Sequence, residues 1–203
     1  MKAVPATPDV VLLTRTPESW VERCLGDLPA LVADHAVCEL QAAVFALSLV
    51  GLYPSSPRLV DVLSALAAEE LRHFRKASRE ARRLGAALPA RRKNPYVSAL
   101  RRACRSGAEP ARGLDLLLVA ALVEARSHER FLALAGRLPD ARLARLYREL
   151  AEAEARHGPA YLELAVAHAG QEATAARLAE LLRVEAEALS GGPGPHVAVH
   201  AAV

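Results

Sequence analysis

Aromatic residues and cysteines are scarce in this chain. Phe, Trp and Tyr make up 4% of its 203 residues, and runs of β-branched residues are few, so the composition gives little support to a β-sheet. The three cysteines, at positions 24, 38 and 104, are an odd number and lack the CxxC spacing of zinc sites. These features exclude a disulfide framework and a thiolate metal site. We therefore expect a protein of the reducing cytoplasm.

Long apolar runs without charges are also missing. None reaches about 18 residues, the length expected of a transmembrane helix. The first twenty residues lack the apolar stretch and small-residue cleavage site of a secretory signal. We therefore expect a soluble cytoplasmic protein that does not associate with membranes.

Strong helix formers dominate what is present. Ala, Leu, Arg and Glu are abundant, and 52% of the residues are hydrophobic. Thr16 is expected to cap the first helix with Pro17 at its first position, and Gly85 to end the third. The apolar periodicity and the turn residues predict helices over residues 17–25, 29–50, 57–84, 96–105, 114–136, 141–170 and 172–189.

The four longest predicted helices fall into two pairs. A connection of about 28 residues, rich in Pro and Gly, separates the pairs, whereas the loops within each pair are short. This connectivity is typical of a ferritin-like four-helix bundle with one crossover. We therefore predict an all-α bundle with a long crossover between its second and third helices and extra helices at both ends. One domain is expected over residues 1–189, followed by a flexible tail over 190–203.

Two predicted helices carry a glutamate three residues before a histidine. These pairs are Glu70 with His73 and Glu154 with His157. Residues three apart share one side of a helix, so each pair can offer a carboxylate and an imidazole to one ion. Chance alone produces about 0.6 such pairs in a chain with this many Glu and His. The pairs therefore gain weight only from their surroundings.

The other two helices of the predicted bundle each contain a lone acid in an apolar stretch. Glu39 precedes Glu70 by 31 residues and Glu124 precedes Glu154 by 30, which suggests a repeated unit. Buried carboxylates usually take up protons or bind cations. Four carboxylates neutralise two divalent ions, and two imidazoles complete a ligand set suited to iron or manganese. The sequence thus predicts a di-iron(II) site held by Glu39, Glu70, His73, Glu124, Glu154 and His157.

Alternatives remain open for the four acids. Glu70 and Glu154 could be ordinary surface glutamates beside solvated arginines. Glu39 and Glu124 could instead pair with a buried arginine such as Arg126.

Several neighbouring residues are left outside the predicted ligand set, among them the acids Glu69, Glu129, Glu149 and Glu152. Glu129 lies about 140° around the helix from Glu124, so we expect it to be solvated or paired. His35, one turn before Glu39, could donate a hydrogen bond to the site or could simply be a core histidine.

Positive charge is concentrated in one segment. Residues 72–105 contain twelve Lys or Arg and a single acid, Glu80, so this segment carries +11, whereas the whole chain carries +3 and its remainder −8. Such a segment can bind RNA phosphates by counterion release, although a solvated arginine face is the alternative. The candidate RNA-binding residues are Arg75, Arg79, Arg82, Arg91, Arg92, Lys93, Arg101, Arg102 and Arg105.

Five stretches of the chain resemble a known family. The segments TPESWVERCLGDLPALVADHA, DHAVCELQAA, EELRHF, VEARSHERF and LYRELAEAEARH, within residues 12–165, are similar to tRNA hydroxylases that act on 2-methylthio-isopentenyl-adenosine beside the anticodon. The resemblance implies a ferritin-like di-iron monooxygenase with the same six ligands. This chain differs from the family pattern at His128, Ala153 and Gly158, which are expected near the pocket.

The resemblance also implies partners. The enzyme would use O₂ and two electrons, from a donor such as a ferredoxin with its reductase, to hydroxylate the prenyl group of tRNA. DNA is not an expected partner. Two other functions remain as alternatives: a ferritin-like di-iron oxidase or iron-binding protein with a different substrate, and a non-catalytic bundle that binds RNA or protein.

Overall fold

A computed structural model describes residues 9–90, 94–190 and 197–200. Within these ranges every regular element is a helix, and the observed bounds lie within three residues of the predicted ones. The all-α prediction is therefore confirmed. The helices are α1 (Glu18–Gly26), α2 (Leu28–Leu52), α3 (Pro57–Arg83), α4 (Pro95–Ala103), α5 (Ala111–Ala135), α6 (Ala141–Ala169) and α7 (Gln171–Leu189).

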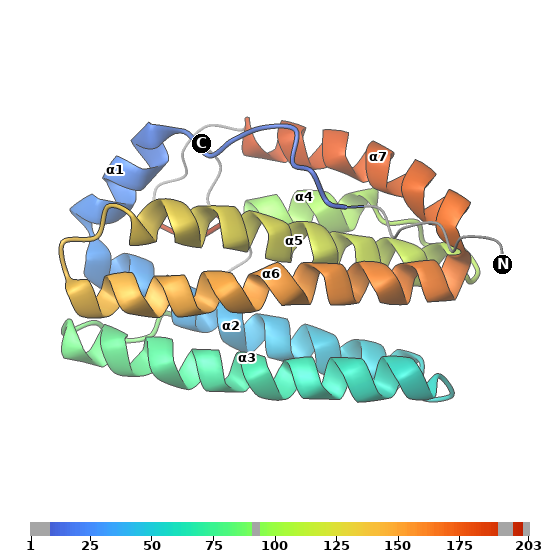
Figure 1. The fold of residues 1–203 in the computed structure, drawn as a ribbon, viewed down its shortest axis with the longest axis horizontal. Helices are drawn as coiled ribbons and strands as arrows, with labels where there is room; N and C mark the ends of the chain where they lie inside the picture. The colour runs from blue at the N-terminus through green and yellow to red at the C-terminus, as the bar shows by residue number, and fades with distance from the viewer. Residues whose placement is uncertain (1–8, 91–93, 191–196, 201–203) are drawn as a thin grey trace, which may run out of the picture.

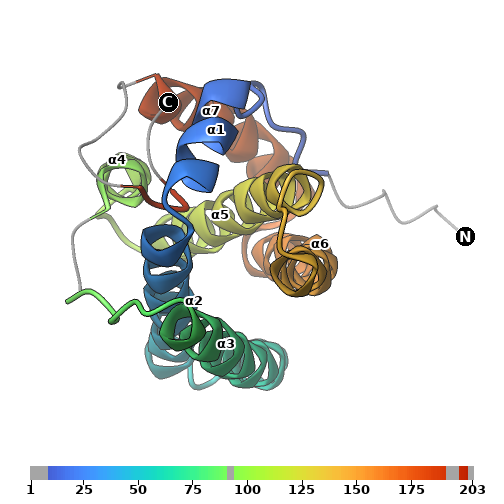
Figure 2. The same ribbon diagram turned by 90° about the vertical axis from the view of Figure 1, so that its left-hand side faces the viewer.

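The bundle consists of α2, α3, α5 and α6, the four longest helices (Figure 1). α2 packs along α3 and α5 packs along α6, and α3 meets α6 between the two pairs. α4 and α7 cover α5 on the side away from α3, and α1 lies across one end (Figure 2). The predicted long crossover between the second and third bundle helices is present, and it contains α4.

Two apolar clusters fill the interior at opposite ends of the bundle. One is rich in leucines from the first half of α5 and the second half of α6, including Leu117, Leu118 and Leu162. The other contains Trp20 and Phe131 together with residues from the start of α6. On each of the four bundle helices, the stretch between the two clusters is the one that carries the predicted metal ligands. The apolar core therefore brackets a polar layer.

Helix α3 ends where the sequence predicts. Gly85 has a φ of +78°, and the amide of Ala86 donates to the carbonyl of Ala81 at 2.9 Å. A left-handed glycine is a common end to a helix because it allows this backward hydrogen bond without a Cβ clash.

The predicted N-cap of the first helix is wrong. α1 begins at Glu18 after Pro17 and has no side-chain cap. Thr16 instead donates its amide and its hydroxyl to the carboxylate of Glu129, each at 2.7 Å. A hydrogen bond to a charged carboxylate is stronger than one between two neutral groups, such as a capping hydroxyl and a backbone amide at a helix end. Thr16 therefore ties the N-terminal segment to α5.

Part of the predicted flexible tail is packed. Within residues 190–203, the described residues Val197 to His200 lie against the helices, and Val199 and His200 are buried. The amide of Val199 donates to Asp34 at 2.9 Å, and the ring of His200 stacks on Tyr96. The sequence shows no apolar period here because single contacts, not a helix face, hold this segment.

Helix α2 is long and apolar enough to cross a membrane by length and composition, and it is the only such helix in the described chain. The sequence analysis found no apolar run of about 18 residues without charges. α2 packs along α3 and buries His35 and Glu39, as expected of a bundle helix. Its outer side exposes Leu40, Val44 and Leu47.

The cysteines are all free thiols, in agreement with the sequence analysis. Burial raises the pKa of Cys24 to about 12 and that of Cys104 to about 11. The thiolate is the reactive form, so we expect neither residue to react with a thiol reagent such as Ellman's reagent at pH 8 while the protein is folded. Both should react after unfolding in guanidinium, which serves as the control. Rapid labelling of the native protein at either residue would contradict this prediction.

Candidate metal centre

All six predicted ligands converge in the polar layer of the bundle. α2 supplies Glu39, α5 supplies Glu124, and α3 and α6 supply the two Glu-x-x-His pairs. Each of the six is buried, with Glu70 fully so and His73 the most accessible at 6%. The alternative that Glu70 and Glu154 are surface glutamates is therefore wrong.

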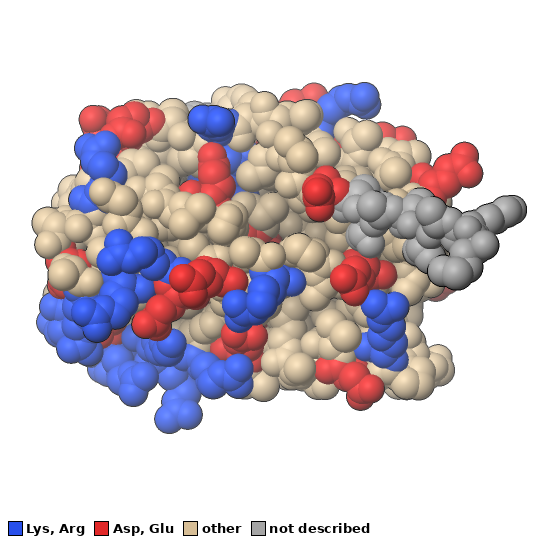
Figure 3. Space-filling view, in the orientation of Figure 1, with Lys and Arg blue, Asp and Glu red and all other residues tan. Residues whose placement is uncertain are grey.

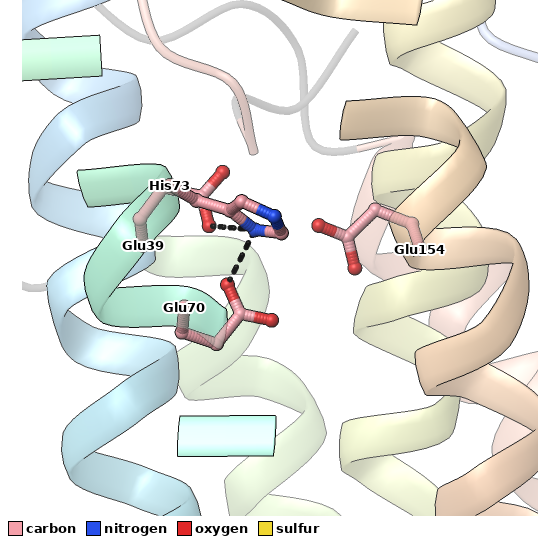
Figure 4. A group of neighbouring side chains, drawn as sticks. All are labelled: Glu39, Glu70, His73 and Glu154. Carbon is pink, nitrogen blue, oxygen red and sulfur yellow. Dashed lines mark hydrogen bonds and ion pairs between the residues drawn. The ribbon is translucent and has the colours of Figure 1, made fainter. Parts of the chain in front are cut away.

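The ligand atoms form two overlapping groups. Within each group, one atom per residue lies within 4.8 Å of every other. Glu70 and Glu154 belong to both groups, whereas each lone acid and each histidine belongs to one. Figure 4 shows the first group, with Glu154 facing the other three across the bundle. The groups are Glu39, Glu70, His73 and Glu154, and Glu70, Glu124, Glu154 and His157.

Both imidazoles direct Nδ1 toward the carboxylates. Nδ1 of His73 lies 3.4 Å from Glu70 and 3.8 Å from Glu39. Nδ1 of His157 lies 2.6 Å from Glu70 and 3.2 Å from Glu154. The two rings stack with centroids 5.9 Å apart. Each histidine thus presents the same nitrogen to the space that it shares with the acids.

One buried oxygen tests whether this site fits a metal. Oε1 of Glu70 is buried and accepts no well-aligned hydrogen bond from the described residues, although Nδ1 of His157 lies 2.6 Å away and forms an ion pair with it when protonated. A carboxylate oxygen left in this state is costly unless a cation binds it. The hard oxygen donors and two imidazoles suit a divalent transition metal. The residues present therefore fit the metal pair that their sequence spacing predicts.

The pKa shifts also indicate that the buried carboxylates destabilise one another's charged forms. Burial, reinforced by the charge of Glu39, raises the pKa of Glu70 to about 8. Burial and the neighbouring Glu154 raise the pKa of Glu124 well above its usual value. Without a cation, protons must neutralise part of this cluster.

The imidazoles are stabilised in their charged form. Burial alone would lower the pKa of His73, but the carboxylates of Glu39 and Glu70, which accept hydrogen bonds from its ring, raise that pKa to about 9. Burial also lowers the pKa of His157, but the carboxylates of Glu154 and Glu70 have the larger combined effect and raise that pKa to about 11. The protons on the two imidazoles thus supply positive charge that a bound metal ion would otherwise supply.

His35 contacts the site from behind. Its Nε2 forms a short hydrogen bond with Glu39, and its Nδ1 lies 3.2 Å from the hydroxyl of Tyr147. Although burial raises the pKa of Glu39, the charge of His35 and the hydrogen bonds with His35, His73 and Glu70 together hold that pKa well below the usual value. His35 therefore orients a predicted ligand, the first of the two roles that the sequence left open.

Arg126 does not pair with the predicted ligands. This buried arginine donates to Glu185 at 2.9 Å and to Glu129 at 2.5 Å. The alternative in which it neutralises Glu39 or Glu124 is wrong, and Glu129 is paired rather than solvated.

Glu69 is a candidate residue that the sequence analysis missed. Its carboxylate lies 3.3 Å from Nε2 of His157 and 4.0 Å from Nε2 of His73, so it contacts the ring nitrogens that face away from the acids. Arg156 holds the same carboxylate at 2.9 Å. Such a partner orients a metal-ligating histidine and strengthens it as a donor. Only its position next to Glu70 could have suggested this role.

Substitution of Glu69 by glutamine is expected to weaken ferrous-ion affinity by about 10- to 100-fold, the usual cost of losing an outer partner of a ligating histidine. The amide keeps the size of the side chain and removes its charge. A titration with ferrous iron under argon measures the affinity. Glu149→Gln is the control, because Glu149 is exposed and pairs with Lys76 away from the cluster. Equal affinities for the two variants would refute a role for Glu69.

A cavity of about 920 Å³ leads from the surface to Glu154. One wall is the N-terminal segment from Asp9 to Thr16, and the others are the middle parts of α5 and α6. Its lining is largely apolar. The lining residues on α5 and α6 include Ala125, His128, Gly158, Pro159 and Leu162.

His128 and Gly158, two of the three positions that differ from the family pattern, lie in this wall. Nδ1 of His128 donates to the carbonyl of Ala151 at 2.8 Å, which fixes the ring against α6. The structure therefore places both at the cavity rather than among the metal-binding groups.

The described candidate RNA-binding residues lie on α3, on α4 and just after α4. Arg75, Arg79 and Arg82 are exposed on α3. Arg101 and Arg102 lie on α4, where Arg101 stacks over Phe45, and Arg105 follows α4 and pairs with the buried Asp115 at 2.6 Å. Arg91, Arg92 and Lys93 lie outside the described residues.

Related proteins match nearly the whole chain. The family model described as tRNA-(MS[2]IO[6]A)-hydroxylase (MiaE) matches residues 4–201. A tRNA 2-(methylsulfanyl)-N(6)-isopentenyladenosine(37) hydroxylase from Pseudomonas putida is 40% identical over 96% of this chain and 94% of that protein. The protein of that name from Salmonella typhimurium is 29% identical over 74% of this chain and 73% of its own length.

A solved structure shares the fold. The Synechococcus protein described as "Protein 43 with aldehyde deformylating oxygenase activity" superposes with a TM-score of 0.89 and is 38% identical. The match covers 93% of this chain and 94% of that one.

Proposed function

Because the chain belongs to the tRNA-(MS[2]IO[6]A)-hydroxylase family, we propose that it hydroxylates the isopentenyl group of 2-methylthio-isopentenyl-adenosine next to the anticodon of tRNA. Two iron ions bound in the bundle would be its cofactor and O₂ its co-substrate. The observation that carries this proposal is the pair of overlapping ligand groups, in which six buried side chains from four helices share one space.

The two groups suggest a division of roles. Glu39 and His73 would hold one ion, and Glu124 and His157 would hold the other. Glu70 and Glu154, which belong to both groups, would help to hold both ions. When bound, such a ferrous pair would activate O₂ so that one oxygen atom can be inserted into a C–H bond.

The reaction needs an electron donor. One oxygen atom of O₂ enters the C–H bond as a hydroxyl group, and the other leaves as water, which requires two electrons and two protons. We propose a small redox protein, such as a ferredoxin with its reductase, as the source of the electrons. The cytoplasm, where tRNA is modified, is the proposed location.

The cavity offers a route by which the apolar isopentenyl group of the nucleoside could reach the metal site. Its apolar walls, formed by residues such as Val10, Leu12 and Leu162, would take up the isopentenyl group and exclude water from it. Glu154 at the inner end marks where the cavity meets the ligand groups. The protein thereby orients the prenyl group toward the ions, which is the main task of a protein that uses a metal cofactor.

The test uses purified protein reconstituted with ferrous iron under argon. The loaded protein is mixed with a reductant, O₂ and tRNA from cells that carry the unhydroxylated nucleoside, and the digested nucleosides are analysed by mass spectrometry. We expect iron to bind and the nucleoside to gain one oxygen atom.

Two other results would point elsewhere. Iron binding with turnover of an aldehyde but not of tRNA would favour a function like that named for the Synechococcus protein. Only a trace of iron per chain would refute every di-iron function and leave a non-catalytic bundle.

A further inference from the structure

Arginines of α3 and α6 gather at one end of the bundle. Arg75, Arg79 and Arg82 are spaced by four and three residues and so share one side of α3. Arg145 and Arg148 lie at the start of α6, and all five side chains are exposed. Figure 3 shows blue side chains concentrated over these parts of α3 and α6. We refer to these five residues as the α3/α6 basic surface.

A hollow of about 360 Å³ joins the two helices at this surface. Arg79 and Arg145 line it, together with the acids Glu80 and Glu149. Both acids are already neutralised, because Glu80 pairs with Arg142 at 2.6 Å and with Arg83 at 2.7 Å, and Glu149 pairs with Lys76 at 2.9 Å.

Arg79 and Arg145 make no ion pair with any described residue. The same holds for Arg75, Arg82 and Arg148. Their positive charge is therefore available to an external anion. Guanidinium groups bind phosphate in two-pronged geometry, which makes such a cluster well suited to a phosphate backbone.

The α3/α6 basic surface continues toward the mouth of the cavity. On an α-helix, residues seven apart lie on nearly the same side, so Arg148, Ala155 and Leu162 form one row along α6. Ala155 and Leu162 line the cavity that reaches Glu154. Arg148 precedes Ala155 by about 10 Å along the helix axis. A chain of phosphates held at the surface would therefore lie beside the opening to the metal centre.

The basic residues on α4 lie elsewhere. Figure 2 shows α4 and α6 on opposite sides of α5. Arg105 is held by the buried Asp115, and Arg101 covers Phe45, so both have structural partners. Among the described residues of the +11 segment, the fold thus separates those of α3, which lie beside the arginines of α6, from those of α4.

We propose that the α3/α6 basic surface binds the sugar–phosphate backbone of the substrate RNA beside the modified base, so that the prenyl group can enter the cavity. This inference rests on the proposed function and adds the place where the RNA lies. Each phosphate contact releases counterions, which makes binding strongly dependent on salt. An acidic electron-donor protein is the rival occupant, but its binding would not require the row that leads from Arg148 to the cavity.

The experiment compares two double variants of the iron-loaded enzyme. Arg145→Glu with Arg148→Glu reverses two charges of the α3/α6 basic surface. The matched control, Arg112→Glu with Arg183→Glu, reverses two exposed arginines on α5 and α7. We expect the first variant to raise the Kd for tRNA by about tenfold or more near 0.1 M salt and to reduce the slope of log Kd against log salt by roughly 1.4 to 2. The control should change Kd by less than about threefold.

Further measurements separate the possible failures. The α6 variant should keep the wild-type iron content and kcat while its KM for tRNA rises, because it leaves the metal centre intact. Equal tRNA affinities for the two variants, with hydroxylation retained, would overturn the surface but not the function. Slower reduction by the donor protein with unchanged tRNA affinity would assign the surface to the rival occupant. A wild-type protein that binds tRNA tightly but never hydroxylates it would refute the proposed function instead.

Discussion

Replacement of Glu154 by alanine is expected to reduce tRNA hydroxylation to less than about 1% of the wild-type rate, since even partners outside the ligand shell contribute about 10- to 100-fold. Glu154 belongs to both ligand groups and lies at the inner end of the cavity. Its loss therefore removes a shared carboxylate from both proposed ions. Iron content should fall from about two ions per chain to one or fewer.

The metal-free fold should survive this change. Glu154 is one of four buried acids that repel one another, and the shorter side chain leaves the apolar clusters at either end untouched. Circular dichroism should therefore show wild-type helicity. Glu152→Ala provides the control, because Glu152 is exposed two residues earlier on the same helix. Wild-type turnover by Glu154→Ala would disprove the ligand assignment, and parallel loss in both variants would indicate a general effect on α6.

Substitution of Arg126 by methionine should lower the free energy of unfolding by about 3–5 kcal/mol, the usual cost of breaking a buried ion pair from one side. The guanidinium and the carboxylate of Glu185 are both fully buried. Arg126 also donates to the carbonyl of Thr14 at 2.9 Å. Without it, Glu185 retains only the hydroxyl of Tyr96 at 2.9 Å among the partners that the structure shows.

A second substitution separates the lost charge balance from lost packing. Adding Glu185→Gln to Arg126→Met removes the unpaired charge while keeping an acceptor for Tyr96, so most of the stability should return. Urea unfolding of the metal-free protein, compared at equal m, measures these differences. Arg183→Met, at an exposed position on α7, should change stability by less than about 0.5 kcal/mol. A loss under about 1 kcal/mol for Arg126→Met would contradict the prediction.

This ion pair also bears on the cavity. Arg126 and Glu129 hold Thr14 and Thr16, which belong to the N-terminal segment that forms one cavity wall. The segment has no regular secondary structure of its own. Its position therefore depends on charged side chains of α5, including Arg130, which donates to the hydroxyl of Thr16 at 3.2 Å.

The metal-binding residues could be predicted from the sequence because the patterns that identify them lie within single helices or single helix pairs. Helical periodicity places Glu70 and His73 on one side of their helix whatever surrounds them, and the similar spacings from Glu39 to Glu70 and from Glu124 to Glu154 indicate a repeated pair. Apolar flanks then identify the lone acids as buried. Those three properties can be read along the chain without knowledge of any tertiary contact.

Other features could not be foreseen because they join distant parts of the chain. Arg126 and Glu185 are 59 residues apart, and no periodic pattern links them. Thr16 fits the pattern of a helix cap, yet Glu129 lies within reach only after α1 crosses the end of the bundle. Glu69 appears equivalent to many exposed glutamates until α6 brings His157 beside it.

The sequence by itself determined the helices, their pairing across a long crossover and the six side chains that face the interior, because helix period and loop length are properties of the local chain. Only the tertiary structure decided which charges meet. Packing of α3 against α6 brings Arg79 and Arg145 to one hollow, and the position of α4 on the far side of α5 separates Arg102 from them. Electrostatic partnership depends on distance through space, which sequence separation does not report.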